Sequence, residues 1–238
     1  MSTSVAEATE AATRRDPPAR AGRYGALLGS ALALLAVQGV APPGPVQQVA
    51  VAALAGSCLV LAVRAARLSR ELRLASLGLA AIAVTIGLAR AFGGMGDGAA
   101  RLCVAALLSL GPPAVALGVM RDLRATGRVE VHAIAGVLAL YLLLGMAFAF
   151  VYGAIDRLGS GDLFADGADA TVSRCLYFSF TTLTTVGYGD FVAGSDLGHT
   201  LAIFEALIGQ IYLVTVVSLL VSNLGRPTGA AVRRPPAP

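Results

Sequence analysis

Charged residues are scarce in this 238-residue sequence, since Asp, Glu, Lys and Arg together make up only 13% of it. Tryptophan and lysine are absent, and there are only three cysteines and two histidines. Three scattered cysteines cannot build a disulfide framework, and two distant histidines lack the ligand spacing of a transition-metal site. We therefore expect free thiols, no organic cofactor and no bound transition metal.

Apolar residues dominate instead. They account for 56% of the chain, and the mean hydropathy is +0.75, which is far too apolar for a water-soluble domain of this size. They form blocks of about 17 to 25 residues, the length of helices that cross ~30 Å of hydrocarbon, without the alternation of barrel strands. The composition excludes soluble enzymes and porin-like barrels, and it predicts an all-α membrane protein.

The apolar blocks predict six transmembrane helices and one shorter segment. We expect the spans at about 24–40, 46–63, 74–88, 102–120, 131–155 and 197–224. Residues 172–183 are apolar too, but twelve helical residues rise only ~18 Å, so this segment cannot cross the membrane. The expected units are a disordered tail (1–23), a four-helix membrane domain (24–124), a second membrane domain (125–224) and a short tail (225–238).

The block at 24–40 has an alternative interpretation as a signal peptide. Arginines precede it, and small residues and prolines follow it. It is long for the apolar core of such a peptide, and no clean cleavage site follows. Cleavage there would leave the interpretation of the later segments unchanged.

Arginine placement predicts which side of the membrane each loop faces. All but four of the 18 arginines lie in loops and tails on the side of the amino terminus, and the exceptions are Arg90, Arg101, Arg157 and Arg174. Because cytoplasmic loops carry the excess of basic residues, we expect a multi-pass protein of the cell (inner) plasma membrane with both termini in the cytoplasm. The arginines follow apolar blocks and form no single basic patch, which argues against nucleic-acid binding.

A glycine-rich string follows the half-length segment. Residues 181–190 read Thr-Thr-Leu-Thr-Thr-Val-Gly-Tyr-Gly-Asp and precede the last span. Irregular backbone at membrane depth persists only where protein buries it or where it lines a water-filled path. Gly187 and Gly189 can adopt the positive φ values that aim successive carbonyl groups at a common axis. The pattern therefore favours a re-entrant helix with a polar pore lining over an ordinary turn.

The Thr-Val-Gly-Tyr-Gly string is identified as the selectivity filter of the tetrameric potassium channels. Residues 131–224 resemble the outer helix, pore helix, filter and inner helix of the bacterial two-span ion-channel group. The resemblance extends to Leu176-Tyr-Phe-Ser-Phe-Thr in the pore helix and Phe204-Glu-Ala-Leu-Ile-Gly-Gln-Ile-Tyr-Leu in the inner helix. The first four spans match by their number and not by their sequence.

The resemblance implies a potassium-selective channel that conducts K⁺ passively through a homotetrameric pore, with 125–224 as the pore domain. The filter would be Thr185, Val186, Gly187, Tyr188 and Gly189, and the carbonyls of the first four residues, with the Thr185 hydroxyl, would hold K⁺. The implied partners are further copies of the chain, the lipid bilayer and K⁺. No enzymatic activity is expected.

Residues around the filter are expected to support it. They are Thr181, Thr184, Asp190, Tyr177, Phe178 and Glu205. Because the chain has no tryptophan, the aromatic cuff common in the family falls to Tyr177 and Phe178. Thr181 stands where some bacterial channels have a Glu, so the carboxylate pair that such a Glu forms with the residue at Asp190 is absent.

Two residues of the last span have alternative roles. Glu205 lies ~12 Å below the outer end of the span, where it either hydrogen-bonds the pore helix from behind or faces the cavity and concentrates cations. We favour the first role, because that depth matches the half-length helix. Gly209 is either a gating hinge or a small residue that permits close helix packing.

Six spans with the pore at the carboxyl end are also the layout of voltage-gated channels. A voltage sensor needs several arginines at every third position within the span before the pore, and 102–120 has none. Arg64, Arg67, Arg70 and Arg73 have that spacing, but they follow the second block, where the positive-inside rule explains them. We therefore expect a sensor-like domain with an uncharged fourth helix and no voltage gating.

Two alternative functions stay open from the sequence. One is a weakly selective cation channel of the same architecture, and the other is a non-conducting membrane subunit that binds other proteins through its first four helices. Tyr188, the aromatic residue that anchors such a filter, argues against the first. The intact string from Thr185 to Gly189 argues against the second.

Overall fold

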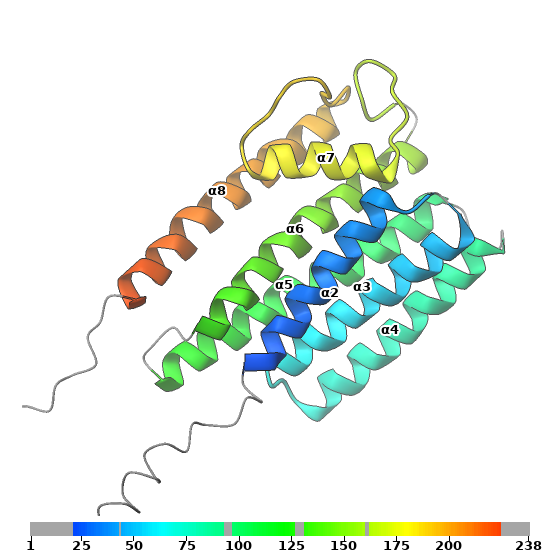
Figure 1. Cartoon of the computed structure of the whole chain (residues 1–238). Helices are drawn as coiled ribbons and strands as arrows, with labels where there is room; N and C mark the ends of the chain where they lie inside the picture. Colours follow the sequence, from blue (N-terminus) through cyan, green and yellow to red (C-terminus); the bar gives the residue numbers. More distant parts are fainter. Residues whose placement is uncertain (1–20, 43, 93–96, 127–130, 160–161, 225–238) are drawn as a thin grey trace, which may run out of the picture.

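The computed structural model describes residues 21–42, 44–92, 97–126, 131–159 and 162–224, so most of both expected tails, 1–20 and 225–238, lies outside the described residues (Figure 1). The helices are α2 (Ala21–Val40), α3 (Pro45–Ala65), α4 (Arg70–Ala91), α5 (Asp97–Thr126), α6 (Val131–Leu158), α7 (Val172–Leu183) and α8 (Asp196–Leu224). Within the described ranges there is no β-strand, only an isolated antiparallel bridge between Phe164 and Ala193.

Five segments are long and apolar enough to cross a membrane. They are Pro45–Ala65, Arg70–Ala89, Gly98–Gly118, Ile134–Leu158 and Asp196–Val216. The apolar part of α2, Tyr24–Val40, is shorter and lies at the lower limit of spanning lengths, so the sixth span stays a prediction. α7, with 12 residues, is too short to cross. The chain is an all-α membrane protein, as the composition predicts.

Several helix boundaries differ from the expected ones. α2 begins at Ala21, so the last three residues of the expected 1–23 tail are helical. The expected basic linker between the second and third spans is short, because α3 continues to Ala65 and α4 begins at Arg70. Arginine is a good helix former with a long apolar stem, so a helix continues past its last apolar residue more readily than a hydropathy pattern indicates.

The expectation of an uncharged fourth helix is wrong. α5 begins at Asp97, earlier than expected, which places Arg101 inside the apolar segment Gly98–Gly118. Arg101 is only 5% exposed, and its Nη1 donates to the carbonyl oxygens of Gly153 (3.2 Å) and Ala170 (2.8 Å). Carbonyl oxygens replace water around the guanidinium, so this arginine does not mark the end of the span. A single arginine still lacks the repeated spacing of a voltage sensor.

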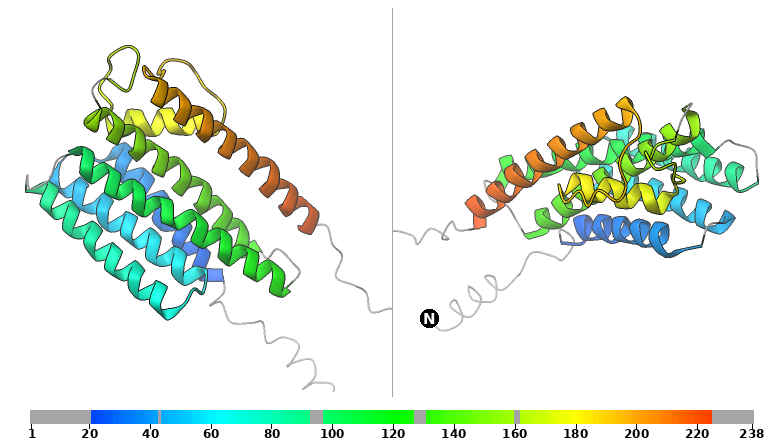
Figure 2. Two further views of the ribbon diagram at one scale, coloured as in Figure 1. Left: turned by 180° about the vertical axis from the view of Figure 1, so that it is seen from behind. Right: turned by 90° about the horizontal axis from the view of Figure 1, so that it is seen from above.

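Helix α3 lies against α2, α4 and α5, while α6 packs against α2 and α5, so the four leading helices and α6 form one bundle (Figures 1 and 2). Buried positions recur three and four residues apart, as expected for one face of a helix. The fully buried examples are Leu27, Ala31 and Leu34 in α2 and Ala139, Leu143 and Met146 in α6. These faces form the core that supports α7.

Helix α7 lies across the end of the bundle where α6 ends and α8 begins (Figure 1). α8 packs against α6 and α7 and against no other described helix, and it stands apart from α2–α5 in the left view of Figure 2. Apolar side chains on its free side are more than half exposed, namely Ile203, Phe204, Leu207, Ile211 and Val214. α2 begins and α8 ends at the end of the molecule opposite α7.

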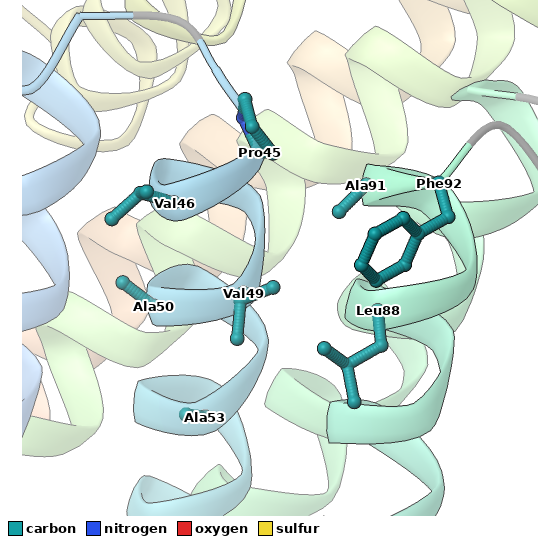
Figure 3. A pocket seen from close by; sticks show the side chains of 8 residues that line it. All are labelled: Pro45, Val46, Val49, Ala50, Ala53, Leu88, Ala91 and Phe92. Carbon is teal, nitrogen blue, oxygen red and sulfur yellow. The ribbon is translucent and has the colours of Figure 1, made fainter.

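The start of α3 and the end of α4 border an apolar groove of about 430 Å³ (Figure 3). Its lining is Pro45, Val46, Val49, Ala50, Ala53, Leu88, Ala91 and Phe92. Figure 3 shows Leu88 of α4, and Phe92 directly after α4, facing Val49 of α3 across the groove. Since no polar side chain lines it, this surface matches the hydrocarbon of a bilayer.

Candidate functional site

The half-length helix α7 is fixed at its start by a side-chain cap. The Thr171 hydroxyl accepts a hydrogen bond from the Arg174 amide at 3.3 Å, and the Arg174 guanidinium donates to the Asp169 carbonyl at 3.0 Å. A threonine cap satisfies an amide that the first helical turn leaves unpaired. α7 therefore begins at a defined residue, and its length fixes where the glycine-rich string starts.

Beyond α7 the chain turns so that its amides bond back to the helix. The Thr185 amide donates to the Thr182 carbonyl at 2.9 Å. The amides of Val186 and Gly187 both donate to the Thr181 carbonyl, at 2.8 and 3.1 Å. The last carbonyls of a helix have no intrahelical donors, so these bonds satisfy them and hold the string beside the end of α7.

Two threonine hydroxyls tighten the same junction. The Thr184 hydroxyl and amide both donate to the Phe180 carbonyl, at 2.6 and 3.1 Å. The Thr181 hydroxyl donates to the Phe178 carbonyl at 3.0 Å. Both predicted support residues therefore turn their side chains toward the helix backbone, away from the exposed edge of the string.

The string has an unusual backbone conformation. φ is positive at Thr185 (59°), Gly187 (51°) and Gly189 (81°), which are alternate residues. Glycine adopts this region readily, but a β-branched residue such as Thr185 is strained there. Within the described part of the chain, no donor reaches the carbonyl oxygens of residues 185–188. Val186 and Tyr188 are 52% and 71% exposed, so this edge of the string is open.

Aromatic rings brace the string on the side of α7. The Tyr177 ring stacks on Tyr188 with centroids 6.1 Å apart and meets Phe191 edge-on at 5.9 Å. Desolvation and the neighbouring Asp190 carboxylate raise the pKa of Tyr177. The predicted residues Tyr188 and Asp190 thus both lie beside Tyr177.

Phe178 lies on the buried side of α7. Its ring meets Tyr152 of α6 edge-on at 5.0 Å and Phe164 of the preceding loop at 5.7 Å. That loop pairs with the segment after the string, since the Ala165 amide donates to the Val192 carbonyl at 2.9 Å. Aromatic packing therefore joins α6, α7 and both flanking loops into one support.

Glu205 is fully buried, with no exposed surface, where α8 meets α6 and α7. Its Oε2 accepts from the Tyr152 hydroxyl at 2.7 Å, and its Oε1 is hydrogen-bonded to the Ser179 hydroxyl. The Ser179 hydroxyl also lies 2.7 Å from the Gly145 carbonyl oxygen. Of the two roles expected for Glu205, this position corresponds to hydrogen bonding behind the half-length helix.

Gly209 lies where α8 approaches the end of α7 most closely. A Cβ atom at this position would overlap the carbonyl oxygen of Leu183. That oxygen also accepts from the Tyr141 hydroxyl of α6 at 3.1 Å, and Tyr141 stacks on Tyr212 with centroids 5.3 Å apart. The close approach accounts for a glycine here on packing grounds alone.

Three residues of this site were not expected from the sequence, namely Tyr141, Tyr152 and Ser179. All three carry hydroxyl groups in otherwise apolar helices, and their partners lie 26 to 53 residues away in sequence. For Tyr152 and Ser179, the signal that could have found them is Glu205, because a buried acid requires donors from the facing helices. Hydropathy alone does not distinguish these residues from the apolar residues around them.

Comparison with known proteins matches residues 136–226 to the family described as ion channel. The chain is 30% identical over 96 residues to the inward rectifier potassium channel Kirbac3.1 of Paramagnetospirillum magnetotacticum, covering 40% of this chain and 31% of that protein. It is 36% identical over 63 residues to potassium channel subfamily K member 4 of Mus musculus, covering 26% of this chain and 15% of that protein.

The chain thus spans less than a third of the length of each of these relatives. No solved structure matches it significantly. The matched segment contains α7, the glycine-rich string, α8 and most of α6. This part of the membrane protein is similar to the ion channel family, and both named relatives are potassium channels.

Proposed function

We propose that the chain is a subunit of a potassium-selective channel whose filter is residues 185–189. The turn after α7 carries the proposal: its amides bond back to α7, and its carbonyl oxygens face no donor within the described chain. Rings of backbone carbonyls replace the hydration shell of K⁺ in potassium channels. The carbonyls of Thr185, Val186, Gly187 and Tyr188 would bind K⁺ in this way, and the two potassium-channel relatives support it.

The working unit of this proposal is a homotetramer. One chain supplies one strand of carbonyls, and a closed ring needs four. The uncovered apolar face of α8 supports assembly. A cavity of about 520 Å³ beside the filter, lined by Thr181, Gly187, His199 and Ile203 among others, is a second unfilled surface that a neighbouring subunit would cover.

The surrounding residues would hold the filter at its working diameter. Tyr177 stacks on Tyr188 and lies beside Asp190, so it would hold the outer end of the filter. Thr181 and Thr184 fix its inner end through the last turn of α7. Glu205 ties α8 to α7, which would couple any movement of the inner helix to the pore helix.

The placement of arginines predicts how the chain is oriented in the membrane and whether voltage gates it. The first and last helices have their terminal ends at the same end of the molecule (Figure 1). With the arginine-rich loops inside, both termini would be cytoplasmic and the filter would lie near the outer face of the plasma membrane. Conduction would be passive, with no catalytic step.

Since α5 carries only Arg101 within its apolar segment, we infer that voltage is not the gating stimulus.

The proposal is tested by ion flux into liposomes that hold the purified full chain. Gly187→Ala and Gly29→Ala are a matched pair, because a Cβ atom at either position meets nothing within 4 Å, but only Gly187 has a positive φ. We expect K⁺ flux without Na⁺ flux for the wild type and for Gly29→Ala. K⁺ flux should fall at least tenfold in Gly187→Ala, since strain of ~1–2 kcal/mol is repeated in four subunits around one axis.

Two results would contradict the proposal. Equal K⁺ and Na⁺ flux in the wild type would favour the weakly selective cation channel. No flux from any variant over a range of voltage, pH and membrane tension would favour the non-conducting subunit.

A further inference from the structure

A second polar cavity lies away from the filter, between the four leading helices and the start of α7. Its volume is about 530 Å³, and it is bordered by the end of α2, the α2–α3 connection, the start of α3 and the first residues of α7. The polar side chains that line it include Gln38, Gln47, Gln48, Arg101, Arg157 and Thr171. Among the described residues that line it there is no Asp or Glu.

The glutamine amides are the unusual feature of this cavity. Gln38 is only 3% exposed, and neither Nε2 nor Oε1 of its amide has a hydrogen-bond partner among the described residues. The Oε1 atom of Gln48 is also buried and finds no partner in the described ranges. Gln47, by contrast, is held by the chain, because its Nε2 donates to the carbonyls of Val37 and Ala41. Buried polar groups are almost always paired, so the Gln38 amide indicates an occupant of the cavity.

Charge specifies the kind of occupant. Arg101, bonded to the Gly153 and Ala170 carbonyls, brings one buried positive charge to the cavity wall. Arg157 adds a second positive charge at the rim, where its side chain is 44% exposed and is offset in part by Asp156 at 3.5 Å. The amino-terminal end of α7 adds the positive end of a helix dipole. Guanidinium groups, an amide donor and a helix amino terminus together match an anion, and phosphate most closely.

We propose that this cavity binds a phosphate group, which links the α2–α3 connection to the start of α7. Its volume lies within the ~300–1,000 Å³ of small-ligand sites and exceeds that of a bare phosphate, so it also accommodates the polar groups attached to a phosphate. The bound phosphate group then belongs either to a phospholipid headgroup or to free phosphate. The unpartnered Oε1 atoms of Gln38 and Gln48 accept from hydroxyl groups on either. The proposal does not depend on potassium conduction.

The test uses the full-length protein in detergent after lipid removal. Its thermal unfolding midpoint is measured with inorganic phosphate against chloride at equal ionic strength, and with phosphatidylglycerol against diacylglycerol, which lacks the phosphate. Bound lipid is counted by native mass spectrometry. Gln38→Met removes the unpartnered amide at nearly constant volume, and Gln210→Met is the matched control on the exposed side of α8.

We expect a phosphate-bearing ligand to raise the unfolding midpoint of the wild type and to saturate at one per chain. Gln38→Met should weaken that binding by about tenfold, the effect of losing one hydrogen bond to a charged group, and Gln210→Met should leave it unchanged. Stabilisation by inorganic phosphate supports the free ion, and stabilisation by phosphatidylglycerol alone supports a headgroup. The proposal is overturned if neither ligand stabilises the protein, which indicates a water-filled cavity, or if Gln38→Met binds like the wild type.

Discussion

At the scale of single residues, the hydroxyl groups around Glu205 supply fewer hydrogens than there are acceptor contacts. The Ser179 hydroxyl has one hydrogen, yet both the Gly145 carbonyl and Glu205 Oε1 lie within hydrogen-bonding reach of it. The Tyr152 hydroxyl supplies a hydrogen only to the other oxygen, Oε2. A side chain at position 205 that brings a hydrogen of its own would complete the network.

The shortage of hydrogens in this network predicts opposite outcomes for two substitutions of Glu205. Gln has the same shape and its amide donates to Ser179 while its oxygen accepts from Tyr152, so Glu205→Gln should keep ion flux within about twofold of the wild type. Glu205→Leu leaves both hydroxyls without their buried partner and should lower the free energy of unfolding by ~2–5 kcal/mol. Thermal unfolding and liposome flux check both. Loss of function in Glu205→Gln would point to a role for the charge itself.

Tyr177 gives a second prediction at this scale. Its ring stacks on Tyr188 and its hydroxyl lies beside the Asp190 carboxylate, so Tyr177→Phe keeps the stacking and removes the hydroxyl. We expect Tyr177→Phe to fold normally but to reduce K⁺ over Na⁺ selectivity, because the outer end of the filter loses a polar group beside Asp190. Bi-ionic flux measures this. If selectivity is unchanged, the Tyr177 ring supports Tyr188 by stacking alone.

At the scale of helices, most of the architecture is predictable from the sequence. Blocks of apolar residues and the prolines before α3 predict the number and order of the long helices, because helix length and lost amide donors are local properties, but several helix ends differ from the expected ones by three to six residues. The expectation that Arg101 lies outside the fourth span is wrong, because burial of its guanidinium depends on the carbonyls of Gly153 and Ala170, which are 52 and 69 residues away. The partners of Glu205 were missed for the same reason. The filter residues could be named from the string, but the bonds back to α7 could not.

Contact between α7 and α8 yields a prediction for Gly209. Because a Cβ atom would overlap the Leu183 carbonyl, Gly209→Ala should destabilise the protein by ~1–3 kcal/mol. Gly78→Ala in α4 is the control, since nothing lies within 4 Å of a Cβ there, and alanine should stabilise the helix by up to ~1 kcal/mol. Thermal unfolding measures both. Normal stability with altered channel opening in Gly209→Ala would instead favour the gating hinge.

At the scale of the whole molecule, the uncovered face of α8 and the open carbonyl edge predict that the single chain is not the working unit. Its mass in detergent, measured by native mass spectrometry, should be four times the 24.0 kDa of one chain plus bound lipid. A monomer or dimer that still conducts K⁺ would contradict the assembly. No pattern in the sequence other than the filter string predicts four copies, because symmetry is a property of surfaces that meet only after folding.

The central claim is selectivity through backbone carbonyls, and the most direct measurement is the reversal potential of the purified protein in a planar bilayer. With K⁺ on one side and Na⁺ on the other, a filter built from residues 185–189 predicts a reversal potential far from zero, with the sign expected for current carried by K⁺. Gly29→Ala should share this value. A reversal potential near zero with measurable current would contradict the account, because the carbonyl edge would then not distinguish K⁺ from Na⁺.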